Sequence, residues 1–214
     1  MFVKERMTKQ PIVAAPDMSV PDALNQMRQQ RIRRLPVVDK GGRLVGIVSD
    51  RDLLHASPSP ATSLSVWEIT YLLGKVRLKD VMTSKVITVT GDTPLEDAAR
   101  IMADNKIGGL PVVDDGALVG IITETDLFKV FVELLGARDK GVRVTLSVPN
   151  TPGQLAGVTR SIADRGGSIL AIAELAATDQ ANRQVMVKAS GISRDEMVAA
   201  LTPAVIAIQD VRES

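Results

Sequence analysis

The sequence predicts an α/β (α+β) protein made of a duplicated α/β unit and a smaller unit that follows it. The duplication appears when the chain is shifted by 75 residues, because Met7-Thr8 then aligns with Met82-Thr83, and 35–39 with 110–114. Residues 141–214 do not match the repeat and show their own alternation of strand and helix patterns. These two observations divide the chain into a repeated part and a separate C-terminal part.

Each repeat contains the same predicted elements in the same order. A short extended stretch, 12–14 or 86–89, precedes an amphipathic helix at about 19–31 or 94–105. Two apolar β-rich runs joined by a glycine-containing turn follow, 35–38 to 44–48 and 110–113 to 118–122. A second helix comes next, and in the second repeat it runs through Leu127–Leu135 and ends at Gly136. Because the β-rich runs are nearly continuous in apolar residues, their sheet is expected to be buried on both faces.

An unmatched segment separates the repeats. Ser57-Pro58-Ser59-Pro60 interrupts any helix, and Leu64–Leu73 is predicted as a short helix with Ser65 and Glu68 as a capping box. The apolar side chains of this helix exceed what one face needs. We expect it to pack on the repeated part or across a dimer interface.

The C-terminal part is predicted as βαββαβ, the ferredoxin-like order. Val142–Val148 alternates as a half-buried strand, and the turn at 149–153 begins a helix. That helix places four apolar residues on one face and ends at Gly166-Gly167. The four are Leu155, Val158, Ile162 and Ala163. Strands at 168–177 and 182–189, a helix at 193–201 with Ser193 and Glu196 as a capping box, and a strand at 205–211 complete the unit.

The composition excludes several classes of function. The chain has no cysteine, so disulfides, zinc–cysteine sites and thiol catalysis are excluded. Its one histidine, His55, is expected at the surface at a helix end, and no metal site is predicted. Three Phe, one Trp and one Tyr are too few for nucleic-acid binding by stacking, and the net charge is +1. No signal peptide or membrane-spanning apolar stretch is present, which indicates a cytoplasmic protein that needs no membrane partner.

The repeated part resembles a tandem pair of cystathionine β-synthase (CBS) domains, the arrangement known as a Bateman module. The likeness is carried by the two Met-Thr starts, the two Leu-Pro-Val-Val-Asp runs, and Gly46–Leu53 and Gly120–Leu127. It divides the chain into CBS motif 1 at 1–56, an inserted linker helix at 57–76 and CBS motif 2 at 77–137. The full order, with a further C-terminal domain, resembles the AcuB-type acetoin-utilisation proteins.

The CBS resemblance implies a cleft in each repeat for an adenosine-containing ligand, with AMP, ADP, ATP and S-adenosylmethionine as candidates. It assigns Ser49 with Asp52, and Thr123 with Asp126, to the ribose hydroxyls. Main chain near Ile12-Val13 and Val86-Ile87 would contact adenine. The alternative is that each Ser/Thr-x-x-Asp caps a helix, and both roles can coexist. The full implied set is Ile12, Val13, Arg33, Arg34, Pro36, Ser49, Asp52, Thr83, Val86, Ile87, Pro111, Thr123 and Asp126.

Arginines before the first Leu-Pro run are candidates for phosphate binding. Arg31, Arg33 and Arg34 stand there, and the second repeat has Gly108-Gly109 where the first has Arg33-Arg34. The two clefts are therefore expected to differ in the cations they offer to phosphate. The alternative is a solvated basic face at a helix end.

Residues 141–214 resemble an ACT domain, on the first strand, Asn150–Leu155 and Gly166–Ile169. ACT domains bind amino acids at this strand–helix turn, which implies contacts from Asn150, Thr151, Gly153, Gln154 and Leu155. The family usually has Asp where this chain has Asn150. The alternative is plain helix initiation, with Asn150 or Thr151 capping and Pro152 in the first turn.

The sequence is compatible with three classes of function. The first is a non-enzymatic ligand sensor, a homodimer whose rearrangement alters an unidentified partner protein. The second is a scaffold dimer whose clefts are empty or weakly occupied. The third, an enzyme, has little support, because the chain is poor in His and Cys and no catalytic domain stands beside the two sensing units. No nucleic-acid partner and no required cofactor are expected.

Overall fold

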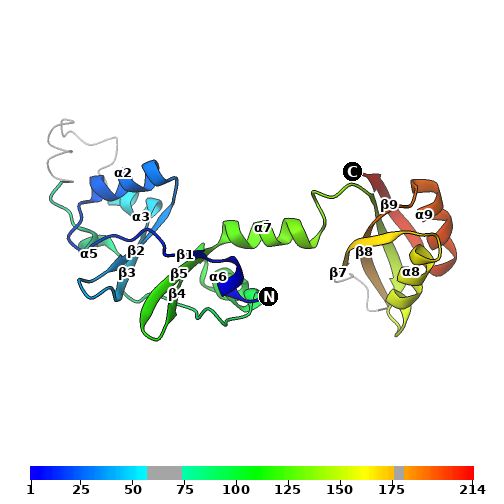
Figure 1. Ribbon diagram of the computed structural model, residues 1–214, viewed down its shortest axis with the longest axis horizontal. Helices are drawn as coiled ribbons and strands as arrows, with labels where there is room; N and C mark the ends of the chain where they lie inside the picture. The colour runs from blue at the N-terminus through cyan, green and yellow to red at the C-terminus, as the bar shows by residue number, and fades with distance from the viewer. Residues whose placement is uncertain (57–73, 176–180) are drawn as a thin grey trace. The chain divides into compact units, whose positions relative to one another are not determined.

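The computed structural model describes residues 1–56, 74–175 and 181–214 (Figure 1). The described residues form two compact units, Met1–Leu127 and Phe128–Ser214. The predicted helix at 64–73, with its capping pair Ser65 and Glu68, lies outside the described residues, as does the turn at 57–60.

The first unit contains both repeats, and each has the predicted order. The first repeat has α2 (Val20–Gln30), β2 (Arg34–Val38), β3 (Leu44–Ser49) and α3 (Asp50–His55). The second has α6 (Leu95–Asn105), β4 (Gly109–Asp114), β5 (Ala117–Thr123) and α7 (Glu124–Leu134). The two long helices end alike, at Arg31 (φ 54°) and Lys106 (φ 53°) in the left-handed conformation. The predicted duplication is therefore confirmed element by element.

The repeats exchange their starting segments. β1 (Thr8–Lys9) crosses to pair with β5 of the second repeat, and Thr83 crosses to pair with Ile47 in β3 of the first. The short helices before these segments, α1 (Val3–Arg6) and α5 (Leu78–Val81), lie at equivalent positions. Leu78, fully buried, belongs to the core of the first repeat. Each repeat therefore completes the sheet of the other.

The remaining extended segments stay with their own repeats. Ala14 forms a parallel bridge to Val37, and Val89 forms one to Val112. The β2–β3 and β4–β5 hairpins are antiparallel, and each has a register shift before the turn. The core of the first repeat lies between its hairpin and its helices, and consists of Ala14, Val20, Ala23, Met27, Leu35, Val37, Val48, Leu53 and Leu78.

Burial on both sheet faces is confirmed for β2, β4 and the end of β5, where Gly120, Ile121 and Ile122 are buried in succession, but not for β3. Leu35, Pro36 and Val37 in β2 are buried in succession, as are the first four residues of β4. In β3, however, Leu44, Val45 and Ile47 are only half-buried, and Ile47 borders the cleft described below.

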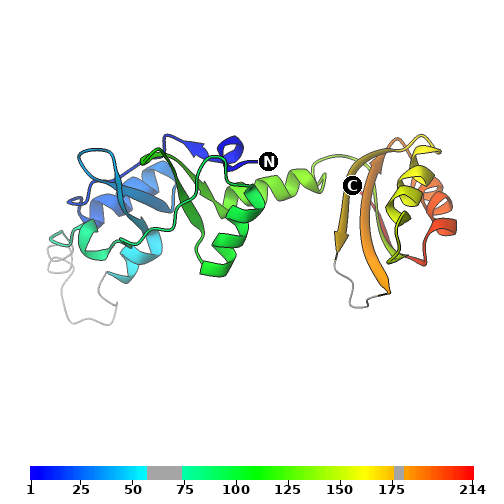
Figure 2. The same ribbon diagram turned by 90° about the horizontal axis from the view of Figure 1, so that it is seen from below.

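The second unit contains β6 (Val142–Pro149), α8 (Gln154–Ala163), β7 (Ser168–Leu175), β8 (Asn182–Ser190), α9 (Arg194–Leu201) and β9 (Ala207–Glu213). Its antiparallel sheet has the order β7-β8-β6-β9, which is the ferredoxin-like arrangement. Figure 2 shows α8 and α9 on the same face of this sheet. Val144, Leu146, Val185 and Val187 point into the core between them.

Three details of the second unit differ from the sequence predictions. Val158 and Ile162 of α8 are fully buried, but Leu155 and Ala163 are exposed, because a single i, i+4 pair covers the sheet. The last strand begins at Ala207 rather than 205, since Thr202–Ala204 forms a 3-10 turn around Pro203. Helix α8 ends at Ala163, three residues before the predicted end at Gly166-Gly167, and Gly166 lies in the turn that follows with φ 79°.

Candidate functional site

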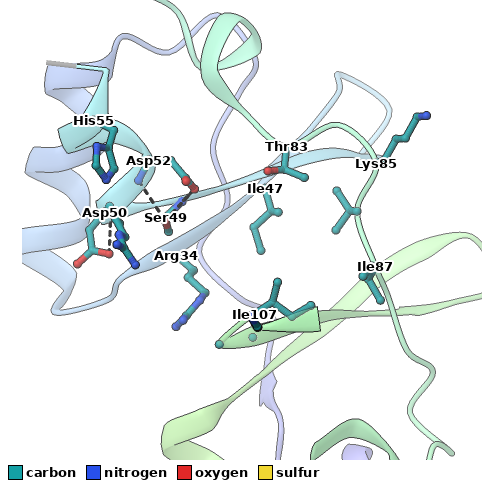
Figure 3. A pocket seen from close by; sticks show the side chains of 15 residues that line it. Arg34, Ile47, Ser49, Asp50, Asp52, His55, Thr83, Lys85, Ile87 and Ile107 are labelled. Carbon is teal, nitrogen blue, oxygen red and sulfur yellow. Dashed lines mark hydrogen bonds between the residues drawn. The ribbon is translucent and has the colours of Figure 1, made fainter. Parts of the chain in front are cut away.

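A cleft of about 600 Å³ opens in the first unit between the two repeats. Sites for small molecules commonly have volumes of roughly 300–1,000 Å³. Figure 3 shows Ser49, Asp52 and His55 on one side of the cleft and Thr83 and Ile87 on the other. Its lining residues are Arg34, Ile47, Ser49, Asp50, Arg51, Asp52, His55, Thr83, Lys85, Val86, Ile87, Lys106, Ile107, Gly108 and Gly109.

Ser49 and Asp52 form a capping box at the start of α3. The Asp52 carboxylate accepts hydrogen bonds from the Ser49 backbone N–H (2.8 Å) and hydroxyl (2.7 Å), both at Oδ2. The Asp52 N–H in turn donates to the Ser49 hydroxyl oxygen at 3.2 Å. The capping interpretation is therefore confirmed. Capping is compatible with ligand contact, because the two capping hydrogen bonds use only the Oδ2 atom of the Asp52 carboxylate. Ser49 and Asp52 also both line the cleft.

The opposite wall comes from the second repeat because the starting segments are exchanged. Thr83 and Ile47 exchange two backbone hydrogen bonds of 3.0 Å, which fixes the segment that continues through Val86 and Ile87. Ile87 is 39% exposed and lines the cleft. Ser49 and Asp52 of one repeat thus face the adenine-contact segment predicted in the other.

The cleft is rich in cationic side chains. Arg34, Arg51, Lys85 and Lys106 line it, against the carboxylates of Asp50 and Asp52. In the repeat alignment, Arg34 and Arg51 correspond to Gly109 and Thr125 of the second repeat. Lys85 and Lys106 correspond to Gln10 and Arg31 of the first. The expected difference in phosphate provision thus extends beyond the Arg33-Arg34 and Gly108-Gly109 pairs.

Several lining residues were not among the predicted contacts. His55 is exposed at the end of α3, as expected, but it also borders the cleft. Lys106 occupies the position equivalent to Arg31, and Lys85 follows Thr83 by two residues. Extending the repeat alignment from Arg31 would have identified Lys106.

Thr123 and Asp126 repeat the same geometry at the start of α7. The Asp126 carboxylate accepts from the Thr123 N–H at 3.1 Å and from its hydroxyl at 2.7 Å, and Asp126 is only 9% exposed.

Seven of the predicted contacts do not line the cleft described above: Ile12, Val13, Arg33, Pro36, Pro111, Thr123 and Asp126. Pro36 and Pro111 are strand residues whose carbonyls accept from Ala14 and Val89.

The second unit has a groove of about 440 Å³ at the turn between β6 and α8. All five predicted amino-acid contacts line it, namely Asn150, Thr151, Gly153, Gln154 and Leu155. Arg183 and Glu174 also line it, and they form an ion pair. Arg183 donates a further hydrogen bond to the Asn150 side-chain oxygen. Leu155, which does not face the sheet, lies in this groove.

Among the residues described, no helix has the length and apolar character needed to cross a membrane.

Comparison with known proteins identifies the family. The sequence profile of the CBS domain matches residues 3–59 and 78–133, more than half of the chain. The chain belongs to the CBS domain family. The two matched stretches coincide with the two repeats, so the resemblance inferred from the Leu-Pro-Val-Val-Asp and Gly-Ile motifs is confirmed for the CBS pair.

Solved structures of other CBS-domain proteins resemble this chain. Vibrio cholerae AcuB, named for acetoin utilization, is 34% identical with a TM-score of 0.54, covering 65% of this chain and 96% of its own. The CBS domain pair of protein MJ0100, solved with 5′-methylthioadenosine and S-adenosyl-L-methionine, is 31% identical with a TM-score of 0.52, covering 65% and 98%. CBSX2 in complex with AMP is 36% identical with a TM-score of 0.50, covering 61% and 96%. Related CBS pairs therefore bind adenosine compounds.

Proposed function

We propose that the protein is a non-enzymatic sensor whose CBS pair, CBS motifs 1–56 and 77–137, binds an adenosine-containing ligand. The observation that carries this proposal is the cleft in which Ser49 and Asp52 face Thr83, Val86 and Ile87. MJ0100, which is 31% identical, binds 5′-methylthioadenosine and S-adenosyl-L-methionine. CBSX2, which is 36% identical, binds AMP. Occupancy would shift the population of two arrangements of the protein and so alter an unidentified partner.

Each part of the ligand has a matching group in the cleft. The Asp52 carboxylate can accept hydrogen bonds from ribose hydroxyls, and the Ser49 hydroxyl adds a polar contact. The main chain near Val86 and Ile87 can bind the adenine edge, with the Ile87 side chain against its face. Thr123 and Asp126, together with Ile12 and Val13, are proposed to form the corresponding site of the second repeat.

Asp52→Ala tests this proposal. The variant should weaken AMP binding roughly tenfold or more, because a hydrogen bond to a charged group is lost. Binding of AMP, ADP, ATP and S-adenosylmethionine would be measured by titration calorimetry and by thermal unfolding. A ligand at 100 times its Kd adds about 2.7 kcal/mol to the free energy of unfolding.

Asp22→Ala is the matched control. Ser19 and Asp22 form a similar Ser-x-x-Asp cap on α2 in the same repeat, in which the Ser19 hydroxyl donates to the Asp22 carboxylate and accepts from the Asp22 N–H, and neither residue lines the cleft. Both substitutions should lower the unfolding free energy by similar amounts, of order 1 kcal/mol. Equal affinities in the two variants would mean that Asp52 only caps α3. Failure of every adenosine compound to bind the wild-type protein would favour the scaffold function.

The groove of the second unit supports an additional function. We propose that residues 141–214 are an ACT domain that binds an amino acid between Asn150–Leu155 and Arg183. A guanidinium suits the ligand carboxylate, and the Glu174 carboxylate suits its ammonium group. Thermal unfolding with the twenty amino acids tests this, and an amino-acid shift that Arg183→Gln leaves unchanged would contradict the assignment.

The protein is further proposed to form a homodimer. Phe128, Phe131 and Leu134 of α7 are 68%, 58% and 62% exposed, a stripe at helical spacing that is costly to leave in water. Light scattering at micromolar concentration should give twice the chain mass, and Phe131→Lys should reduce it. A wild-type monomer at that concentration would contradict the proposal.

A further inference from the structure

His55 belongs to the wall of the cleft that carries Ser49 and Asp52. It is the last residue of α3, and it follows Asp52 by three positions. Residues three apart lie on the same face of a helix, so the His55 ring and the Asp52 carboxylate share one side of α3. Figure 3 shows Ser49, Asp52 and His55 together on this wall, and all three line the cleft. A row of polar side chains therefore runs along α3 from the proposed ribose contacts to His55.

The equivalent position in the second repeat also carries a basic side chain. The alignment that places Asp52 over Asp126 places His55 over Lys129. A lysine ammonium keeps its charge at neutral pH, whereas histidine is the side chain whose charge ordinarily changes between about pH 5 and 8. Each repeat thus has a basic group one helical turn after its proposed ribose carboxylate, and in the first repeat this group is a histidine.

Charged side chains from every wall of the cleft act on the His55 ring. In the described part of the chain, those that line the cleft are Arg34, Asp50, Arg51, Asp52, Lys85 and Lys106. The two carboxylates, both on α3, stabilise a protonated imidazole, and the four cations oppose it. An anionic ligand offsets the repulsion from these cations and is itself attracted by a protonated ring. Protonation of His55 and binding of an anion in the cleft therefore favour each other.

We propose that His55 makes the affinity of this cleft for anionic adenosine compounds depend on pH, with tighter binding when its ring is protonated. The inference rests on the proposed function and names a regulation of the same site. A neutral imidazole adds only a polar surface to the wall, whereas an imidazolium adds a positive charge to the four already there. By linkage, a ligand that binds the protonated form more tightly also draws a proton onto the ring.

Two variants that fix the charge of residue 55 test this inference. His55→Gln keeps the side chain neutral, and His55→Lys keeps it positive, as at the equivalent position of the second repeat. Calorimetric titrations of AMP into the full chain would compare both variants with wild type at about pH 6 and about pH 8. At the lower pH, wild type and His55→Lys should bind AMP roughly three- to tenfold more tightly than His55→Gln. At the higher pH, the wild-type affinity should fall to that of His55→Gln, while His55→Lys stays tighter.

The comparison separates the charge of His55 from other effects of pH. Protonation of the AMP phosphate affects all three proteins alike and cancels in the ratios of their affinities. Adenosine is the matched control because it lacks the phosphate charge, and its affinity should differ by less than about twofold among the three proteins. His55 is the one histidine of the chain, so its ring signals in NMR are unambiguous. Saturating AMP should move the midpoint of their titration in the wild-type protein to higher pH.

The outcomes distinguish this inference from the proposed function. If the ratio of wild-type to His55→Gln affinities for AMP is the same at both pH values, the inference is overturned, while AMP binding itself still supports the proposed function. An equal pH response with adenosine also overturns it, because the ligand charge would then play no part. If wild type binds neither AMP nor adenosine, both proposals fail.

Discussion

Gly46 and Gly120 occupy equivalent positions in β3 and β5, and each lies against a methionine from the exchanged segment of the other repeat. A Cβ on Gly46 would collide with the Met82 side chain, and one on Gly120 with Met7. The methionines belong to the Met-Thr starts that cross between repeats. The glycines therefore permit the close approach of the crossing segments that completes each sheet.

Gly46→Ala is expected to destabilise the first unit. The added methyl must displace Met82 in a packed region, which typically costs about 1–3 kcal/mol. Because the three atoms closest to the added methyl belong to Met82, the double variant with Met82→Ala should lose less than the sum of the single losses. Urea unfolding of the three variants measures this. Strict additivity would show that Gly46 and Met82 are not coupled.

Gly157→Ala adds the same methyl group but is expected to stabilise the protein rather than destabilise it. Gly157 lies within α8, and a Cβ there would meet nothing within 4 Å. Alanine should therefore raise the unfolding free energy by up to about 1 kcal/mol through helix propensity. Destabilisation by both alanines would indicate that glycine substitution is harmful for a reason other than contact with methionine.

The residues of the cleft were predicted only where their signal is local. Ser49 and Asp52 lie three apart in one motif, so the pattern itself identifies them. Which starting segment faces them depends on the exchange between repeats, which involves a pairing of only one or two residues across a long stretch of chain. No periodicity encodes such a contact. Lys85, two residues after Thr83 on the exchanged segment, was missed for the same reason.

At the scale of elements, helices and hairpins with strong patterns were predicted within one or two residues. Helices α2 and α6 follow the apolar spacing of Val20, Ala23 and Met27 and of Leu95, Ala98 and Met102, all of them buried. The predicted strand start at 205 was wrong. Val205 and Ile206 have high strand propensity, but the 3-10 turn around Pro203 delays the start of β9 to Ala207. Tertiary context decides such boundaries.

The capping box of α9 gives a prediction for pH. The Glu196 carboxylate accepts from the Ser193 hydroxyl at 2.6 Å and from its N–H at 2.9 Å, and these bonds hold the pKa of Glu196 below its usual value. The folded pKa lies below the unfolded one. The contribution of Glu196 to stability is therefore present above the usual glutamate pKa and is lost as pH falls through the lowered value.

Ser193→Ala should raise the pKa of Glu196 toward its usual value, since the hydroxyl bond is the largest cause of the shift. Carboxyl chemical shifts followed by NMR during an acid titration measure it directly. Arg165 also lowers this pKa, through its charge, so Arg165→Gln serves as a comparison and should produce a smaller change. A larger change in Arg165→Gln would show that charge, rather than the cap, dominates.

For the whole molecule, the decisive feature is that each unit has its own core. The core of the second unit consists of residues between Val142 and Val211, and that of the first repeat of residues between Ala14 and Leu78. Compact units with separate cores commonly unfold as separate cooperative steps. The protein is therefore expected to unfold in two steps.

AMP should raise the unfolding free energy of only one of the two units. Because the proposed nucleotide cleft is built from the two repeats, binding adds free energy to the first unit alone. Hydrogen exchange read by mass spectrometry separates the units, with peptides from β2 and β3 reporting on one and peptides from β6 and β8 on the other. Saturating AMP should slow exchange in the first set and leave the second unchanged. Equal protection of both sets would mean that the C-terminal unit senses the occupied cleft directly, and regulation would then pass through it rather than through the CBS pair alone.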